Sequence, residues 1–285
     1  MAKTGLVLEG GGMRGIYTAG VLDVFLEHDI AFDGVIGVSA GAIHGATYVA
    51  KQKGRSIRYY KRHIKERRFM SVWNLITTGD YVGEKFCYQD LPNIYDPFDY
   101  KTFQDSKTKF YAGMTDVATG RPAYKLITDA KKQMKLIRAS ASLPIISKPV
   151  LYHGHIYLDG GCSDSIPVRA MRERGYDRIV VIETRDRNYM KKPTNMKLIR
   201  KIYKHYPRFC HQLSLRHVLY NQTRMEIEAQ AESGRLFLIQ PSKPLQIGRL
   251  EKNPKKLQEI YDIGRMDAEM KLAEMKKWLA DTKAE

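Results

Sequence analysis

The stretch that decides the fold is Gly34-Val35-Ile36-Gly37-Val38-Ser39-Ala40-Gly41. Its first residues predict a short buried strand, and the small and apolar residues 40–50 predict a helix. Gly37 and Gly41 stand two residues to either side of Ser39. A serine at the tip of a tight strand-to-helix turn is crowded, and glycines at these two positions relieve the clash. The pattern predicts a nucleophile elbow, with the Ser39 hydroxyl exposed at the carboxyl end of a sheet.

The preceding segment has a related arrangement. Thr4–Leu8 is a short apolar run that leads into Gly10-Gly11-Gly12-Met13-Arg14-Gly15, and apolar residues with helical spacing follow over 15–26. Strand, glycine turn, helix, strand, tight turn and helix predict an α/β fold with a parallel sheet.

The remaining chain divides by composition near Glu183. Before it, we expect strands at 109–115, 121–127, 155–158 and 178–183, the third within a hairpin at 149–158, and helices at 130–141 and 167–174. After it, basic residues dominate 185–208, and helices at 211–231 and 254–283 flank a strand at 235–239. We therefore predict a catalytic core over 1–183 and a basic, mainly helical extension over 184–285, packed together as one domain.

The charge balance points to a polyanionic partner. Lys and Arg number 48 against 31 Asp and Glu, a net charge of +17. Such a surplus favours nucleic acid or an anionic membrane surface, although a generally basic soluble enzyme explains composition alone equally well. The basic residues concentrate in 51–68 and in 185–208, and in the second stretch Tyr, Ile and Met are interleaved with them.

Targeting signals and cysteine usage favour the cytoplasm. No apolar run approaches the roughly 20 residues needed to span a bilayer. The apolar stretch before Glu9 is too short for a secretory signal. Cys87, Cys162 and Cys210 are odd in number and widely spaced, which suggests neither a disulfide framework nor a metal site. We expect a cytoplasmic protein that can lie peripherally on the inner face of the membrane.

The glycine cluster at 10–15 is compatible with two chemistries and with a plain flexible turn. As Gly-x-Gly-x-x-Gly it matches a dinucleotide fingerprint, which would make the chain a nucleotide-dependent oxidoreductase. That fingerprint needs an acid after the second strand, where Gly37-Val38-Ser39 stands instead. Three consecutive glycines better suit a loop whose N–H groups approach a reacting oxygen, as in an oxyanion hole. Arg14 is then placed to fix this loop or to meet a phosphate.

Asp159, at the end of the 155–158 strand, is the candidate base for Ser39. Two glycines follow it, and because Asp-Gly is a common turn, Asp159 could have a purely structural role. A functional role is favoured because a serine needs a base before it can attack an ester. Histidine is the usual base, and His153 and His155 are the candidates for a triad; His44 lies five positions beyond Ser39 and points away. Surface or packing roles suit these histidines better. A partly desolvated Asp159 gains a pKa above the usual 3.9 or so of an aspartate and becomes a stronger base.

Three motifs of this sequence, taken in order, resemble those of the patatin-like phospholipases. They are the glycine cluster at 10–15, the elbow at 37–41 and Asp159-Gly160-Gly161. Residues 115–120 and 139–144 are also similar to segments of that family, and the resemblance covers about residues 5–183. It implies three layers, a mostly parallel central sheet flanked by helices, and no metal or cofactor. It also implies a Ser39–Asp159 dyad and an oxyanion hole. The residues it assigns are Gly11 and Gly12 as oxyanion donors, Arg14 beside the hole, and Gly10, Gly15, Gly37, Gly41, Gly160 and Gly161 as motif glycines.

The expected function is therefore metal-independent hydrolysis of lipid esters through an acyl-enzyme, of phospholipase A, lysophospholipase or esterase type. The stretches 51–68 and 185–208 are expected to meet anionic headgroups, and no nucleic acid is expected as a partner. The alternative is a membrane- or nucleic-acid-binding protein with a vestigial hydrolase site, which would use the basic and aromatic residues of 185–208.

Overall fold

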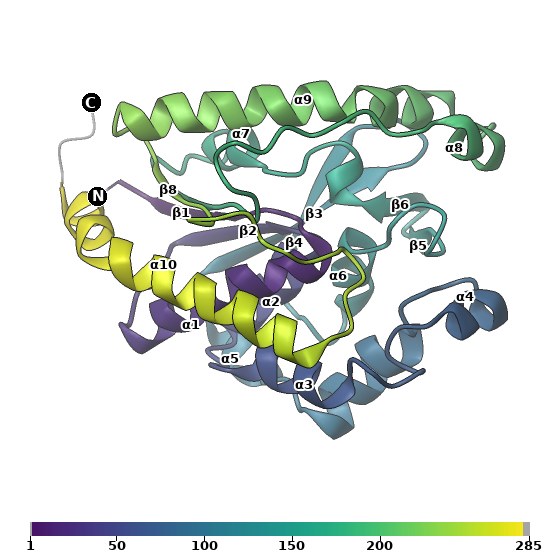
Figure 1. Ribbon diagram of the computed structural model, residues 1–285, viewed down its shortest axis with the longest axis horizontal. Helices are drawn as coiled ribbons and strands as arrows, with labels where there is room; N and C mark the ends of the chain where they lie inside the picture. Colours follow the sequence, from purple (N-terminus) through teal and green to yellow (C-terminus); the bar gives the residue numbers. More distant parts are fainter. Residues whose placement is uncertain (1, 282–285) are drawn as a thin grey trace.

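A computed structural model of the chain describes residues 2–281. Within this range an eight-stranded sheet has the order β5-β6-β3-β2-β1-β7-β8, with β4 paired to β3 (Figure 1). The strands are β1 (Thr4–Leu8), β2 (Gly34–Val38), β3 (Lys109–Asp116), β4 (Pro122–Ile127), β5 (Val150–Tyr152), β6 (His155–Asp159), β7 (Arg178–Ile182) and β8 (Phe237–Ile239).

The centre of the sheet is parallel and one end is antiparallel. Strands β3, β2, β1, β7 and β8 run parallel, whereas β4 and β6 are antiparallel to β3, and β5 to β6. The register pairs Leu8 of β1 with Gly37 of β2 on one side and with Ile182 of β7 on the other. The glycine loop and Ser39 therefore leave the sheet side by side. The predicted mostly parallel α/β sheet is confirmed.

Helices cover both faces of this sheet and give the three predicted layers (Figure 1). On one face, Val7, Ile36 and Val181 pack in the apolar cluster that includes residues of α7 and α9. On the other, Leu6 and Leu8 pack in the cluster that includes residues of α1, α2 and α10. Alternate residues of the buried strands thus serve opposite layers. The helices are α1 (Ile16–Glu27), α2 (Ala40–Val49), α3 (Arg55–His63), α4 (Val72–Thr78), α5 (Tyr100–Asp105), α6 (Met134–Ser140), α7 (Val168–Arg172), α8 (Lys197–Ile202), α9 (Pro207–Glu232) and α10 (Pro254–Ala280).

Helix α10 packs closely along α1 although the two are far apart in the sequence. Gly20 of α1 faces the backbone of Tyr261, and Gly264 of α10 faces the backbone of Tyr17, with no room at either glycine for a Cβ atom. Tyr17 also donates a hydrogen bond to Asp267 (3.0 Å), and Tyr261 donates one to Asp23 (2.7 Å). The last long helix therefore covers the first one.

The division predicted between residues 183 and 184, which separates the catalytic core from the C-terminal extension, falls just after β7 and remains a prediction.

Several element boundaries differ from the prediction. The basic stretch 51–68 forms a helix only over α3, which begins directly after Gly54 in a left-handed conformation (φ 69°). The helix expected at 130–141 is α6, and the one expected at 254–283 ends at Ala280, with 282 and 283 outside the described residues. A 3-10 turn at Gly12–Gly15 precedes α1. The segment 69–105, left unassigned from sequence, forms α4, the π-helix η2 (Phe86–Tyr95) and α5.

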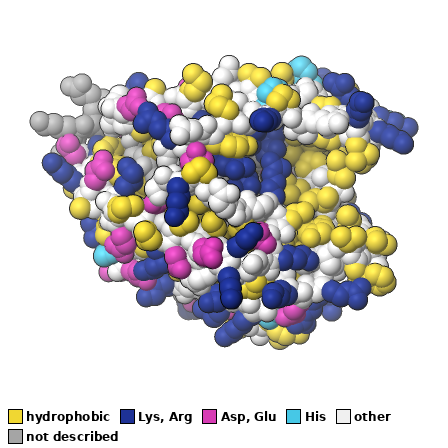
Figure 2. Space-filling view, viewed as in Figure 1, with side chains coloured by type: hydrophobic (Ala, Val, Ile, Leu, Met, Phe, Trp, Pro, Cys, Tyr) yellow, Lys and Arg dark blue, Asp and Glu magenta, His cyan; other side chains and the backbone are white. Residues whose placement is uncertain are grey.

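The end of the molecule that carries α4, β5 and α8 is hollowed. Figure 2 shows hydrophobic side chains lining a cleft there, with Lys and Arg side chains along its upper and lower margins. None of the helices within residues 2–281 contains an apolar run of the length that a bilayer crossing requires.

Candidate active site

Ser39 occupies the tight turn between β2 and α2 that the glycine spacing predicts. Its backbone lies at φ 55° and ψ −122°, a conformation that side chains rarely adopt. A Cβ at Gly37 would lie 2.5 Å from the carbonyl oxygen of Gly41, and one at Gly41 would lie 2.5 Å from that of Leu8. Both glycines are therefore needed for the turn to pack against itself and against β1.

Asp159, at the end of β6, is in hydrogen-bonding contact with Ser39. The Ser39 hydroxyl donates to Asp159 Oδ2 at 2.7 Å, and the Gly161 N–H donates to Asp159 Oδ1 at 2.7 Å. Burial raises the pKa of Asp159, while the hydrogen bond from Ser39 and the positive charge of Arg216 act in the opposite direction. A buried carboxylate with a raised pKa is a better proton acceptor than a free one.

Ser140 of α6 supports the elbow through two hydrogen bonds, a role that the sequence does not predict. The backbone N–H of Ser39 donates to Ser140 Oγ (2.9 Å), and that hydroxyl donates to the carbonyl of Gly113 on β3 (2.6 Å). The residue lies in the 139–144 segment already noted for its family resemblance, which is the only signal in the sequence that singles it out. Gly160 lies against the same Gly113 carbonyl, with no room for a Cβ.

The glycine loop lies beside Ser39. Gly10 N–H donates to Ser165 O (3.2 Å) and Met13 N–H to Arg249 O (3.2 Å), whereas the N–H groups of Gly11 and Gly12 donate to no other group in the described part of the chain. Gly12 has a φ of 57°. It lines the cavity next to Ser39, and Gly11 is not among the lining residues.

Two further residues matter for this loop. Ala40 follows Ser39 and lines the same cavity, so its N–H at the start of α2 is a third candidate oxyanion donor, one that sequence reasoning missed. Gly15 lies against Ala40, where a Cβ would approach the Ala40 Cβ to 2.5 Å. The predicted motif glycines at 10–15 and 37–41 thus pack on one another.

Arg14 is buried, with only 6% of its surface exposed. Its Nε has no hydrogen-bond partner within residues 2–281. Burial, followed by repulsion from Arg185, lowers the pKa of Arg14 to about 10, so the side chain is still charged at neutral pH.

Within residues 2–281, none of the histidines bonds to Ser39 or Asp159. His44 is buried and contacts the Ser56 hydroxyl through Nδ1 (2.9 Å), and burial lowers its pKa to about 3. His155 contacts Asp116 Oδ2 (2.8 Å) on the neighbouring strand. His153 stands at the hairpin turn with a φ of 47°. The geometry therefore offers a two-residue arrangement rather than a triad.

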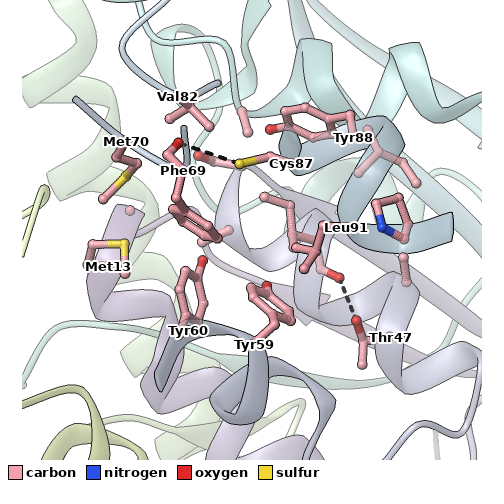
Figure 3. Close-up of a pocket in the computed structure, with 18 of the residues that line it drawn as sticks. Met13, Thr47, Tyr59, Tyr60, Phe69, Met70, Val82, Cys87, Tyr88 and Leu91 are labelled. Atoms are coloured by element: carbon pink, nitrogen blue, oxygen red, sulfur yellow. Dashed lines mark hydrogen bonds between the residues drawn. The ribbon is translucent and has the colours of Figure 1, made fainter. Parts of the chain in front are cut away.

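Ser39 opens onto a cavity with an empty volume of about 970 Å³, its open mouth included. Figure 3 shows Tyr59 and Tyr60 of α3 pointing into it below Phe69, with Leu91 of η2 on another side. The lining is mostly apolar and also includes Ile43, Ala46, Met70, Val82, Phe98, Met134 and Ile137. A cavity of this kind suits a hydrocarbon chain better than a polar ligand.

No group of three or more His, Cys, Asp or Glu side chains in the described residues is placed to hold a metal ion. The expectation of a metal-free, cofactor-free site remains a prediction.

The sequence matches a family model over this same part of the fold. The model, described as patatin-like phospholipase, matches residues 6–172. The chain belongs to the patatin-like phospholipase family. A second model, described as a domain of unknown function (DUF6363), matches residues 206–280 and thus spans all of α9, β8 and α10.

Relatives of this patatin-like chain include a bacterial protein of similar length. The Escherichia coli (strain K12) protein named "Uncharacterized protein YjjU" is 30% identical over 98% of this chain and 80% of its own length. A "Lysophospholipase NTE1" of Meyerozyma guilliermondii is 30% identical over 63% of this chain, and the match spans 12% of that protein. The crystal structure of VipD from Legionella pneumophila matches 96% of this chain and 67% of its own with a TM-score of 0.47 and 13% identity.

Proposed function

We propose that this chain is a serine acyl hydrolase that cleaves ester bonds of lipids, with Ser39 as nucleophile and Asp159 as base. The observation that carries the proposal is the 2.7 Å hydrogen bond from Ser39 Oγ to Asp159 Oδ2 beside an apolar cavity. Membership of the patatin-like phospholipase family supports a lipid substrate, and so do the relatives named lysophospholipase.

In the proposed first half-reaction, Ser39 Oγ attacks the ester carbonyl carbon and its proton passes to Asp159. The oxyanion that forms accepts hydrogen bonds from the N–H groups of Gly11 and Gly12, and the Ala40 N–H is a further donor. When the tetrahedral intermediate collapses, the C–O bond breaks and the leaving alcohol takes the proton from Asp159. The acyl group remains on Ser39 as an ester.

In the second half-reaction, Asp159 takes a proton from a water molecule whose oxygen attacks the acyl-enzyme. Collapse returns the proton to Ser39 Oγ and releases the fatty acid. Each step uses only this chain's own groups and water, so the proposal calls for no metal or cofactor. Arg14 adds a positive charge beside the loop that holds the oxyanion.

Incubating the purified protein with a mixed lipid extract and analysing the products by mass spectrometry tests the proposal. We expect free fatty acids to appear together with the matching deacylated lipids. Intact lipids after prolonged incubation, with a protein that is folded by circular dichroism, would contradict the assignment.

The pH dependence of the same reaction reports on the base. Asp159 must be ionised to accept the proton, and burial raises its pKa. Activity should therefore fall as the pH falls through this raised pKa, so the acid limb of kcat/KM lies above the ordinary range of an aspartate. An acid limb within or below that range would argue against a desolvated Asp159 as base.

The proposal includes peripheral contact with an anionic membrane through the end of the molecule that carries α4 and α8. Trp73 and Ile76 of α4 are 56% and 74% exposed, and Leu198 and Ile202 of α8 are also exposed. Lys197, Arg200, Lys201 and Lys204 lie on or next to α8. Both helices flank the hollowed, hydrophobic end of the molecule (Figures 1 and 2). Exposed apolar side chains ringed by cations suit an anionic bilayer surface.

Not all of the basic stretch 51–68 is free for this contact. Arg55 is buried and pairs with Asp96 (3.3 Å), and Arg58 pairs with the same carboxylate (2.7 Å). These two cations hold α3 to the segment after η2, whereas Lys61, Arg62, Lys65 and Arg67 have no carboxylate partner in the described chain.

Vesicle co-sedimentation tests the membrane surface. Binding should rise with the content of anionic lipid and weaken with salt, since each Lys or Arg near such a surface contributes about 1 kcal/mol. Ile76→Asp should lower the partition coefficient by about tenfold or more, because it removes an exposed apolar side chain whose transfer into the bilayer is worth roughly 1.5–3 kcal/mol. The matched control is Met270→Asp, which alters a similarly exposed residue of α10 (68%). Binding that is indifferent to lipid charge, or equal losses in both variants, would refute the proposed surface.

A further inference from the structure

Five cationic side chains without a carboxylate partner gather on one side of the dyad, and two of them, Arg216 and Arg249, act on Asp159 itself. Arg14 comes from the glycine loop, Arg185 and Lys191 from the segment after β7, Arg216 from α9, and Arg249 from the loop before α10. None of the five side chains forms an ion pair or donates a hydrogen bond within residues 2–281. We call these five residues the cationic cluster.

The members of the cluster lie close enough to repel one another. Burial, followed by the positive charge of Arg216, lowers the pKa of Lys191 to about 7, with Arg249 and Arg14 acting in the same direction. The Nε atoms of Arg14 and Arg216 are buried and have no acceptor in the described chain. The ammonium group of Lys191 lies 3.8 Å from the centre of the Tyr220 ring. Of the five, Arg14 is buried, Arg185, Lys191 and Arg216 are half-buried, and Arg249 is exposed. Charges that are withdrawn from water without a partner are unfavourable, so a structure that keeps them usually has a use for them.

The nearby carboxylates Glu9 and Asp159 attract the cluster electrostatically but form no ion pair with it within residues 2–281. Glu9 accepts hydrogen bonds from the Tyr220 hydroxyl (2.6 Å) and the Thr184 hydroxyl (2.9 Å). Asp159 accepts them from Ser39 and Gly161. Both acids therefore bind neutral donors, and the cations remain available to a ligand.

The cluster borders the proposed position of the scissile ester. A Cβ on Gly161, next to the dyad, would lie 3.2 Å from Arg216 Nη2. Arg249 lines the same cavity as Ser39. Figure 2 shows Lys and Arg side chains gathered in a hollow beside the hydrophobic cleft. A lipid with its acyl chain in the apolar cavity and its ester at Ser39 would carry its headgroup into the cluster.

We propose that the cationic cluster binds the terminal phosphate of a lipid phosphate monoester whose ester bond is presented to Ser39. The inference rests on the proposed function and narrows its substrate class. A terminal phosphate carries close to two negative charges at neutral pH and exposes three acceptor oxygens, which matches several converging Arg and Lys donors. A choline-bearing phosphodiester carries one negative charge and a cation that these side chains would repel.

Equilibrium binding to the Ser39→Ala protein tests the inference without requiring turnover. The ligands are short-chain, monomeric lipids with one acyl chain: a lysophosphatidate, the matching lysophosphatidylcholine and the matching monoacylglycerol. We expect the lysophosphatidate to bind at least about tenfold more tightly than either of the others, because only its terminal phosphate brings close to two negative charges to these charge-assisted hydrogen bonds. Inorganic phosphate should compete with it, but far more weakly than the intact lipid.

Two substitutions within the cluster, made in the same background, separate a binding role from a structural one. Lys191→Met and Arg216→Met should each lower lysophosphatidate affinity about tenfold, and they should leave or raise the Tm of the unliganded protein, because each removes a half-buried charge that has no carboxylate partner. The matched control is Lys276→Met on α10, which is exposed and should change neither quantity. If the cluster variants have a lower Tm but still bind lysophosphatidate more tightly than the other two lipids, by an undiminished factor, the cations have a structural role. That result would overturn the inference.

Other outcomes separate this inference from the proposed enzyme. Equal affinity for all three lipids, with hydrolysis that depends on Ser39 in the wild-type protein, would overturn the headgroup site and leave the hydrolase. Phosphate-selective lipid binding without any hydrolysis would leave the headgroup site and reject the hydrolase. Free phosphate binding as tightly as the lipid would also overturn the headgroup assignment.

Discussion

Ser39→Ala and Asp159→Asn should each lower the rate of lipid ester hydrolysis by about 10⁴-fold or more while the protein stays folded. Ser39 Oγ is the atom proposed to attack, and no hydroxyl remains in the alanine variant. In the asparagine variant the hydroxyl remains, but its partner at 2.7 Å can no longer accept a proton. The two losses should not add in the double variant, because both residues serve the same step.

Labelling by a fluorophosphonate probe provides a second readout of the same residues. The wild-type protein should become labelled, and the Ser39→Ala protein should not. Asp159→Asn should label far more slowly, since the nucleophile is present but not activated.

Asp164 provides a matched control for the loss of a carboxylate. It lies in the loop after β6, and its Oδ2 accepts a hydrogen bond from the Tyr124 hydroxyl (2.5 Å) rather than from Ser39. Burial raises its pKa, as it does for Asp159. Asp164→Asn should keep most of the activity. Undiminished hydrolysis by Ser39→Ala, or equal losses in the two asparagine variants, would remove the dyad from the mechanism.

Gly264→Val should lower the free energy of unfolding by about 3 kcal/mol or more. A side chain at this position would meet the backbone of Tyr17 in α1, so the two helices would have to separate. Separation would also stretch the hydrogen bonds that join Tyr17 to Asp267 and Tyr261 to Asp23. Valine itself has only a modest helix penalty, so most of the loss would come from packing.

Denaturant unfolding followed by circular dichroism measures this effect, and Ala273→Val on the exposed side of α10 is the control for the valine. The control should lose less than about 1 kcal/mol. We also expect hydrolase activity and helical signal to disappear in one transition, because α10 covers α1 in the same apolar cluster as the sheet. An early transition of α10 alone, with an intact active site, would show that residues 184–285 form a separate unit.

The parts of the fold that could be predicted from sequence are those with a local cause. Ser39 lies in a strained turn because Gly37 and Gly41 permit close backbone contacts, and this requirement is visible in five consecutive residues. The buried strands are similarly recognisable, since Val7, Ile36 and Val181 belong to short apolar runs bounded by turn residues. The pairing of Ser39 with Asp159 was inferred from chemical need, and the structure brings the two side chains together.

The segment 69–105 could not be assigned from sequence because its helices lack the usual periodicity. Val72, Trp73 and Ile76 of α4 are exposed, so their spacing does not mark a buried face. Pro92 lies inside η2, where a proline normally argues against a helix. Helix α4 buries no residue of its own and is bounded by the Ser71 cap and by Gly79, whereas η2 packs Phe86 and Leu91 into the core.

The cationic cluster could not be predicted from the sequence for a different reason. Arg185 and Lys191 belong to a stretch predicted to lie on a membrane surface, yet their charges converge with those of Arg14 and Arg249. The sequence distance between Arg14 and Arg249 exceeds the length of most domains, so no local pattern links them. Arg55 is a similar case, because its buried partner Asp96 lies beyond two intervening helices.

The pairing of α1 with α10 has a consequence for how a cell makes this protein. Tyr17 and its partner Asp267 are 250 residues apart, so at roughly 5–20 residues per second α1 emerges from the ribosome about 10 to 50 s before α10. During that interval the side of α1 that packs against α10 in the folded protein remains uncovered. Nascent chains should therefore be held by chaperones that bind exposed apolar segments, and ribosome profiling of chaperone-bound chains should show engagement that ends only after α10 has been translated.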